Sequence, residues 1–127
     1  MNHRDIKFVT ATPKLVKRFY DGKPPIKTIR GFVAVAEGER VIGIGGISYE
    51  GKTMLAFTEM KPEMRKHKKA MARAVRLLET FYNNLPYPVV AFAHSEEPTA
   101  PGLLKRLGFV NTGLKTDQGE ILVRSPQ

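Results

Sequence analysis

The pattern of apolar and polar residues predicts a strand followed by a short helix at the start of the chain. Asp5 to Ala11 predicts a short first strand. Thr12 to Gly22 predicts a helix with Thr12 as its cap, Pro13 at the first helical position and Gly22 as the stop. Its apolar stripe is formed by Leu15, Val16, Phe19 and Tyr20.

Three strand-like runs come next and predict an antiparallel meander. They are Ile29 to Glu37, Arg40 to Glu50 and Lys52 to Met60. A two-residue hairpin signal, Gly38-Glu39, separates the first two, and Glu50-Gly51 turns the chain into the third. Glycines inside the second run favour a bulge or a bend in the sheet: Gly43, Gly45 and Gly46.

The second half of the chain predicts a long helix, a buried strand, a short helix and a closing hairpin. The stretch from Met60 to Phe81 reads as an amphipathic helix, with an apolar stripe at i, i+3, i+4 spacing. That stripe comprises Met71, Ala74, Val75, Leu78, Phe81 and Tyr82. Val89 to His94 is typical of a strand buried on both faces, and Thr99 to Phe109 of a short helix ending near Gly108. A hairpin of Val110 to Leu114 with Glu120 to Arg124 follows.

This order, β-α-β-β-β-α-β-α-β-β, predicts an α/β fold. We expect a mixed, mostly antiparallel sheet of six to seven strands flanked by helices on both faces. No internal repeat or linker interrupts the pattern, so residues 1–127 predict a single domain.

The beginning of the long helix poses a problem of charge. Arg65, Lys66, His67, Lys68 and Lys69 crowd the place where the helix dipole is positive. Two explanations are open at this point. The helix begins upstream, at Pro62, and the basic residues form a solvated face in its second turn, or an anion binds over the helix start.

Composition strengthens the case for an anionic partner and narrows the class of protein. The chain has 21 Lys and Arg against 12 Asp and Glu, a net charge of +9, which attracts nucleotides, phosphorylated cofactors, nucleic acid or acidic proteins. Cysteine is absent, so neither disulfides nor a thiolate metal site is expected, and no metal site is predicted. Neither the apolar run of a signal peptide nor a membrane span is present in the sequence, so a cytoplasmic protein without membrane contact is expected.

With these elements in place, the chain resembles the GNAT superfamily, the Gcn5-related N-acetyltransferases. The element order is similar over nearly the whole chain. The family pattern VxPxxRGxGxG/A is matched in "MKPEMRKHKKA" by Met60, Pro62, Arg65 and Ala70. A second motif, a helix ending in "GF", is matched in "EPTAPGLLKRLGF" by Ala100, Leu103, Leu107, Gly108 and Phe109. Its compactness and its departures from the motifs make it similar to small, divergent GNAT-like proteins encoded by bacteriophages.

The resemblance implies acetyl-CoA as cofactor and an amine as second substrate. In this family the loop and the helix start hold the pyrophosphate, and the pantetheine runs between two splayed parallel strands. Met60 would then offer main-chain hydrogen bonds to the pantetheine, and a V-shaped opening is expected between the strand ending at Met60 and Val89 to His94. The phosphate contacts would come from Arg65, Lys66, His67, Lys68, Lys69 and Ala70.

The sequence departs from the family at four positions. Lys66 and Lys68 stand where the family carries glycines, which allow a left-handed backbone and a close approach of phosphate. Leu104 stands where many members carry the tyrosine that protonates the thiolate, and Glu97 where an asparagine contacts the cofactor.

Two residues are candidates for the base that an amine acceptor requires. Glu59 ends the strand before the basic segment, where family members carry such a group, and His94 has an unperturbed pKa near neutrality. The alternative for Glu59 is a sheet-edge carboxylate paired with a lysine, and for His94 a residue that only leads toward the next helix.

Three functions compete at this stage. The first is direct acetyl transfer from acetyl-CoA to an unidentified amine. The second is a catalytically degraded GNAT-like module with a structural role, acting with a protein partner or as a homodimer. The third is nucleic-acid binding through a basic helix face without interleaved aromatics or a known motif, and it ranks last. That face comprises Arg65, Lys66, Lys68, Lys69, Arg73 and Arg76.

Overall fold

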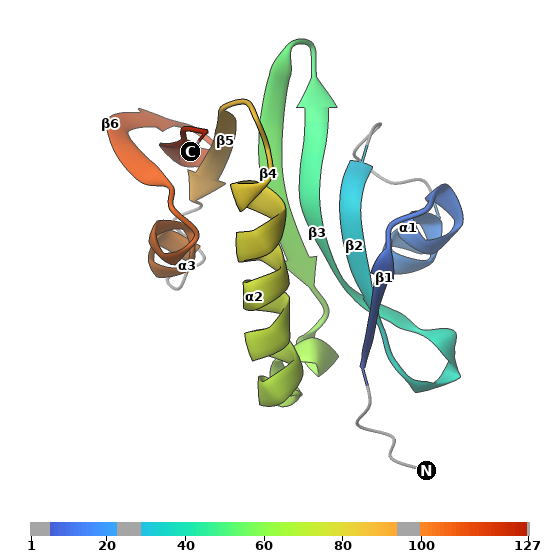
Figure 1. Cartoon of the computed structure of the whole chain (residues 1–127). Helices are drawn as coiled ribbons and strands as arrows, with labels where there is room; N and C mark the ends of the chain where they lie inside the picture. The colour runs from blue at the N-terminus through green and yellow to red at the C-terminus, as the bar shows by residue number, and fades with distance from the viewer. Residues whose placement is uncertain (1–5, 23–28, 94–99, 127) are drawn as a thin grey trace.

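The computed structural model describes residues 6–22, 29–93 and 100–126. The elements follow in the order β1 (Lys7–Thr10), α1 (Pro13–Tyr20), β2 (Ile29–Val35), η1 (Glu37–Glu39), β3 (Val41–Glu50), β4 (Thr53–Met60), η2 (Pro62–Lys66), α2 (Lys68–Asn83), β5 (Val89–Ala93), α3 (Ala100–Arg106), β6 (Val110–Thr116) and β7 (Gly119–Arg124). The strands form one seven-stranded sheet in the order β1-β2-β3-β4-β5-β7-β6 (Figure 1). All neighbouring pairs are antiparallel except β4 and β5, so the predicted mixed sheet is confirmed.

Helices cover both faces of this sheet. On one face, α1 packs Val16 and Phe19 against Val33 and Ile44 of the central strands. On the other face, α2 packs against β3 and β5 and shares a core with α3 (Figure 1). That larger core comprises Ile47, Leu78, Tyr82, Leu85, Val89, Ala91, Ala93, Leu107, Phe109 and Leu122. Within the part of the chain described, no helix is long and apolar enough to cross a membrane.

Local sequence signals account for α1 as expected. The Thr12 hydroxyl accepts a hydrogen bond from the Leu15 N–H at 3.3 Å, and Pro13 occupies the first helical position. Asp21 ends the helix in a left-handed conformation at φ 53°, one residue before the predicted stop at Gly22.

Two glycines of β2 and β3 allow their backbones to approach closely. A Cβ on Gly31 would lie 2.0 Å from the carbonyl oxygen of Gly45, and one on Gly46 would lie 2.1 Å from that of Arg30. Gly46 also has φ +148°, which side chains other than glycine rarely adopt. The predicted bulge is confirmed beside Gly43, because the pairing of β2 with β3 shifts register from Ala34–Gly43 to Val35–Val41.

Two of the three hairpins, β2–β3 and β6–β7, have turns that differ from the expectation. Gly38 (φ 79°) and Glu39 (φ 59°) turn the chain where the hairpin was predicted, but they belong to the short 3-10 turn η1. The closing hairpin is tighter than expected, because β6 extends to Thr116 and β7 begins at Gly119. Residues 115–119, predicted as its loop, are mostly strand.

A buried arginine on β7 joins the ends of α2 and α3. Arg124 is 2% exposed, and its guanidinium donates to the Leu107 carbonyl at 3.0 Å, the Tyr82 carbonyl at 2.9 Å and the Asn83 side-chain oxygen. Tyr82 in turn donates its hydroxyl to the Gly46 carbonyl at 2.8 Å. The cation thus lies at the carboxyl ends of two helices, where their dipoles favour positive charge.

Replacing this arginine should destabilise the fold. In Arg124→Met, the acceptors on Leu107, Tyr82 and Asn83 lose their donor in a buried place, so we expect the free energy of unfolding to fall by about 2–4 kcal/mol. Urea unfolding followed by circular dichroism measures this change.

The matched control is Arg106→Met. Arg106 is exposed and meets Glu79 at 3.7 Å, so its loss should change stability by less than about 0.5 kcal/mol. Equal effects of the two substitutions would contradict the role given to Arg124.

Candidate functional site

The sheet is weakly joined between β4 and β5. These parallel strands share a single ladder pair, Leu55 with Val90, among the residues described. Beyond that pair, toward Met60 on one strand and Ala93 on the other, no further ladder pair joins them. The predicted opening between the carboxyl ends of these strands is therefore present in the backbone pairing.

The long helix begins at Lys68, directly beside this opening. Pro62–Lys66 form the separate 3-10 turn η2, and His67 caps α2 without a side-chain hydrogen bond. The first main-chain bond of the helix runs from the Met71 N–H to the His67 carbonyl at 2.9 Å. The N–H groups of residues 68–70 therefore have no acceptor within the helix. An α-helix starting at Pro62, one of the two explanations left open by the sequence, is thus wrong.

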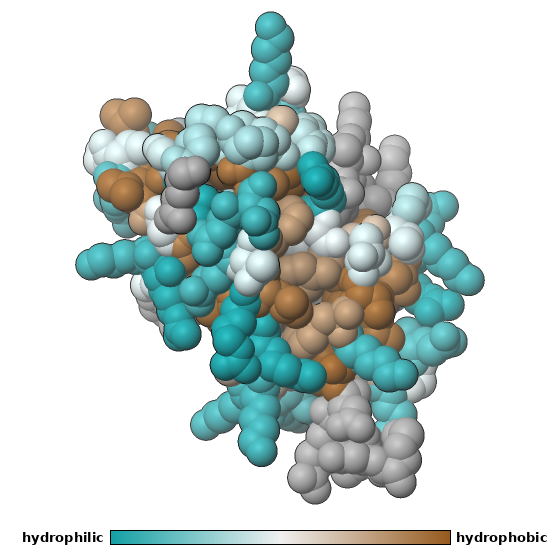
Figure 2. Space-filling view, viewed as in Figure 1, coloured by the Kyte–Doolittle hydropathy of each residue, from teal (hydrophilic) through white to brown (hydrophobic). Residues whose placement is uncertain are grey.

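Basic side chains surround this helix start. Arg65, Lys66, Lys68 and Lys69 are exposed, His67 is half-buried, and the first turn of α2 contains no acidic residue. Hydrophilic side chains gather over this end of α2 (Figure 2). Each cation placed at a helix amino end costs about 0.3–1 kcal/mol unless an anion is present. The arrangement therefore favours binding of an anion.

The two lysines at the family's glycine positions do not adopt a left-handed backbone conformation. Among described residues other than glycine, Asp21 and Glu39 have positive φ, whereas Lys66 and Lys68 do not. Lys66 ends the 3-10 turn and Lys68 begins α2, so neither position needs the left-handed backbone that glycines allow.

Met60 and Ala70 support the site through packing. Met60 ends β4 opposite Gly43, and Ala70 is 3% exposed in a cluster with Met64 and Ile42. The small side chain at position 70 lets the first turn of α2 lie directly on η2.

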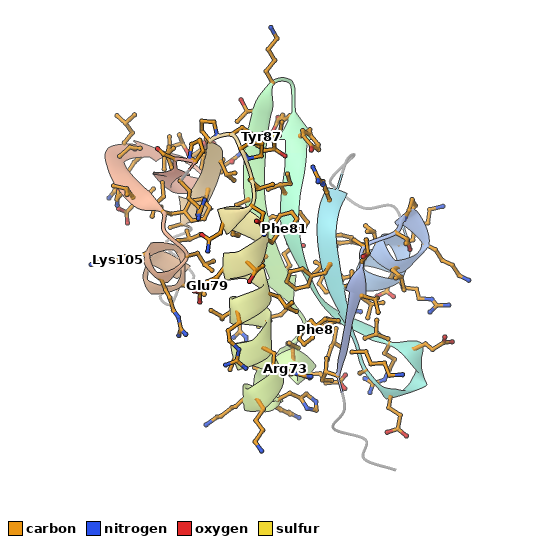
Figure 3. The ribbon with its side chains drawn as sticks, viewed as in Figure 1. Phe8, Arg73, Glu79, Phe81, Tyr87 and Lys105 are labelled. Atoms are coloured by element: carbon orange, nitrogen blue, oxygen red, sulfur yellow. The ribbon has the colours of Figure 1, made fainter. Side chains whose placement is uncertain are left out.

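Arg73, one of the six basic residues considered for nucleic-acid binding, has a structural role. Arg73 donates to the Ile6 carbonyl at 2.8 Å, and its guanidinium carbon lies 5.2 Å from the centre of the Phe8 ring. Figure 3 shows Arg73 reaching from α2 toward Phe8 on β1. This side chain fastens the first strand to α2, which weakens the case for a basic face devoted to nucleic acid.

Glu59 has a partner that differs from the expected lysine. The Tyr20 hydroxyl, at the end of α1, donates a hydrogen bond to the Glu59 carboxylate. Burial raises the pKa of Tyr20, and the hydrogen bond and negative charge of Glu59 raise it further. Tyr20 therefore stays protonated at neutral pH and acts as a donor.

The base candidate and the anion site lie on opposite faces of the sheet. Glu59 pairs with Ile44, which faces α1, whereas Met60 packs in the cluster with Met64 and Ala70 under the start of α2. Alternation of side chains along β4 produces this separation. A group reaching from one side to the other would pass through the gap beside β4.

Three positions singled out in the sequence remain: Leu104, His94 and Glu97. Leu104 is half-buried and packs against the larger core, so its position on α3 supplies no proton donor. His94 and Glu97 lie outside the described residues. No group of three His, Asp or Glu side chains in the described ranges could hold a metal ion.

A hollow of about 490 Å³ lies on the α1 side of the site. Its lining includes Asp21, which directly follows Tyr20, and Lys61, which lies two residues after Glu59. Charges in the lining are balanced, with three cations and three carboxylates: Arg18, Arg40, Lys61, Asp21, Glu39 and Glu63. Among these, Arg40 and Glu63 form an ion pair that lowers the pKa of Glu63.

Sequence reasoning missed Tyr20. It was assigned to the apolar stripe of the first helix, and its ring does pack beside Phe19 at 4.9 Å and in the cluster with Phe57. Its hydroxyl meets a carboxylate 39 positions away, and no local pattern carries that signal.

Solved structures show where this fold occurs. No family model and no curated protein matches the sequence. A GNAT-family acetyltransferase from Staphylococcus aureus Mu50 superposes with a TM-score of 0.66 at 9% identity, over 97% of this chain and 100% of that chain. The ribosomal-protein-S18-alanine N-acetyltransferase from Escherichia coli gives 0.63 at 11% identity, over 95% and 94% of the two chains.

A third structure was determined with ligands. Spermidine N-acetyltransferase from Vibrio cholerae, in complex with CoA and spermine, superposes with a TM-score of 0.57 at 14% identity, over 93% of this chain and 92% of that chain. These likenesses establish that the chain has the GNAT fold, as the sequence motifs predicted.

The Tyr20–Glu59 contact can be tested without any ligand. In protein labelled with ¹³C at the tyrosine Cζ, Tyr20 should remain protonated at a pH where an ordinary tyrosine, with a pKa of about 10, has ionised. In Glu59→Gln the negative charge is removed, so the pKa of Tyr20 should fall. An NMR titration measures both.

Tyr82 is the internal control for this titration. Burial raises its pKa, and its hydroxyl donates to Gly46, far from Glu59 in sequence and on the other face. Its titration should not respond to Glu59→Gln. A wild-type Tyr20 that ionises like free tyrosine would show that the contact does not form in solution.

Proposed function

We propose that this chain, a single GNAT-like domain over residues 1–127, is an acyl-CoA-dependent N-acetyltransferase that transfers acetyl directly to an amine. One observation carries the proposal. A cationic helix start without acidic residues lies at the end of the sheet where β4 and β5 separate. The fold is shared with N-acetyltransferases, one of them determined with CoA and spermine.

Acetyl-CoA would be held at two places, the start of α2 and the end of β4. The phosphates would meet the N–H groups at the start of α2 and the side chains of Lys68 and Lys69, an arrangement suited to anions. Arg65, Lys66, His67 and Ala70 complete this segment, and Met60 would offer its main chain to the pantetheine beside the unpaired edge of β4. The thioester supplies an activated acetyl group.

Glu59 is the proposed base. An amine must lose a proton before its lone pair can attack the thioester carbonyl, and the exposed Glu59 carboxylate lies on the α1 side of β4 to accept that proton. The C–N bond then forms as the C–S bond breaks, and the leaving thiolate takes a proton from solvent, because Leu104 offers none. His94 remains a second candidate for the base.

A structural or interaction module is the second candidate function. The observation that favours it is Leu104, whose side chain packs into the core where the family carries a tyrosine. This alternative predicts a protein partner or a homodimer and no acyl transfer. The similarity to phage-encoded proteins remains a prediction.

Acetyl-CoA binding should depend on the start of α2. At an ionic strength of about 0.15 M, calorimetry should give saturable binding, and Lys68→Ala/Lys69→Ala should weaken it by about 10- to 100-fold, because two charge-assisted contacts are lost. The test of transfer is release of free thiol from acetyl-CoA with two amines, spermine and a peptide with an amino-terminal alanine.

The matched control is Lys14→Ala/Lys17→Ala. It removes the same charge from exposed positions on α1, taking the net charge from +9 to +7 in both variants, so binding should stay within about twofold of wild type. Equal weakening of acetyl-CoA binding in both variants would show that net charge, and not the position of the lysines at the start of α2, determines the affinity. Absence of binding by wild-type protein would refute the enzyme proposal and favour the structural alternative.

A further inference from the structure

We propose that Tyr20 is a positioning residue that holds the Glu59 carboxylate on the amine side of the β4–β5 opening. This inference rests on the proposed function and adds a residue that none of the family motifs supplies. Its basis is the hydrogen bond from the Tyr20 hydroxyl to Glu59, made between the end of α1 and the end of β4.

The Tyr20 side chain is held by its own helix. Its ring is half-buried, packs edge-on against Phe19 with ring centres 4.9 Å apart, and contacts the cluster that contains Phe57. Aromatic pairs of this geometry prefer such an edge contact. The hydroxyl therefore projects from a packed ring rather than from a mobile chain.

A second set of contacts fastens the same helix end to the same strand end. Lys61, two residues after Glu59, lies 5.5 Å from the centre of the Phe19 ring and 3.9 Å from the Asp21 carboxylate. The helix residues on either side of Tyr20 thus both meet Lys61. These contacts keep the distance between Tyr20 and Glu59 short.

Glu59 needs such support because its side chain is exposed near the end of a strand. Ordering a free glutamate side chain in one position costs rotamer entropy. The phenol holds one carboxylate oxygen, and no other hydrogen bond to this carboxylate occurs among the described residues. The second oxygen is left to accept a proton from an amine.

Tyr20 is suited to positioning and not to proton abstraction. Burial and the neighbouring carboxylate raise its pKa, so the phenol keeps its proton and donates a hydrogen bond to Glu59. The charged groups around the pair, Asp21 on α1 and Lys61 after β4, pair with each other. Glu59 remains the group that touches the amine, and Tyr20 acts through it.

A double-mutant cycle tests this assignment. In the thiol-release assay with spermine and the alanine-terminated peptide, Tyr20→Phe should lower kcat by about 10-fold with the KM for acetyl-CoA unchanged, and Glu59→Gln should lower kcat by about 10²–10⁴-fold. Because Tyr20 acts through Glu59, Tyr20→Phe should have no further effect in the Glu59→Gln background, within about twofold.

Tyr49→Phe is the control substitution. Tyr49 lies on β3 with its side chain packed on the α2 face, so loss of its hydroxyl should leave kcat unchanged. Thermal melting of each variant separates a folding defect from a kinetic one. Tyr20→Phe should keep the wild-type melting temperature within a few degrees.

The outcomes separate the inference from the proposed function. Turnover by wild-type protein with an unchanged Tyr20→Phe variant, or with effects of Tyr20→Phe and Glu59→Gln that multiply, overturns the positioning role and leaves the transferase proposal standing. No thiol release with either amine, together with no binding of acetyl-CoA, overturns both.

Discussion

Tyr82 links the two halves of the sheet by hydrogen bonds at the place where their backbones are joined least. β1 to β4 form one antiparallel block and β5 to β7 another, and a single described ladder pair joins them. The Tyr82 hydroxyl donates a hydrogen bond to the Gly46 carbonyl in the first block. The Tyr82 carbonyl accepts a hydrogen bond from the Arg124 guanidinium in the second. Because this tie lies at the carboxyl end of α2, the sheet is closed there and free to separate at the helix's other end. The gap between β4 and β5 removes backbone hydrogen bonds that would otherwise join the two strands. The hydrogen bonds of Tyr82 provide a connection in their place.

In the proposed reaction, the gap between β4 and β5 is where the cofactor and the amine meet. Successive side chains on a strand point to opposite faces, so Glu59 and Met60 are divided between the α1 side and the α2 side without any special loop. The cationic helix start shares the side of Met60, and the Tyr20–Glu59 pair faces the other way. In the proposed reaction the cofactor and the amine therefore approach from different faces and meet at the unpaired edge of β4. Strand alternation and helix placement keep the cationic start of α2 apart from the negatively charged Glu59 carboxylate.

The sequence predicted the elements well because their signals are local. The Thr12 cap, the apolar stripe of α2 and the strand at Val89 are found where spacing placed them, although β5 is fully buried on one face and half-buried on the other, at Val90 and Phe92. Prediction failed where a contact or a conformation depends on the rest of the fold. An α-helical start at Pro62 is compatible with the sequence, but the chain makes a 3-10 turn that buries Met64 before α2 begins. The Tyr20–Glu59 pair could not be inferred either, because the same residue that completes an apolar stripe also carries a hydroxyl, and only the packing of α1 on the sheet decides which atom it meets.

The 3-10 turn also changes how an anion can be held. Glycines in the family loop let phosphate approach the backbone, so short-range hydrogen bonds contribute much of the binding. In this chain the backbone at positions 66 and 68 is not left-handed, and long cationic side chains project from those positions instead. Their attraction acts at longer range and in water, where salt screens it over about 8–10 Å. A site built in this way relies on charge more than on backbone fit. If acetyl-CoA binds here as proposed, its affinity should therefore fall more steeply with ionic strength than in a glycine loop, and the excess positive charge of the chain would contribute to that binding.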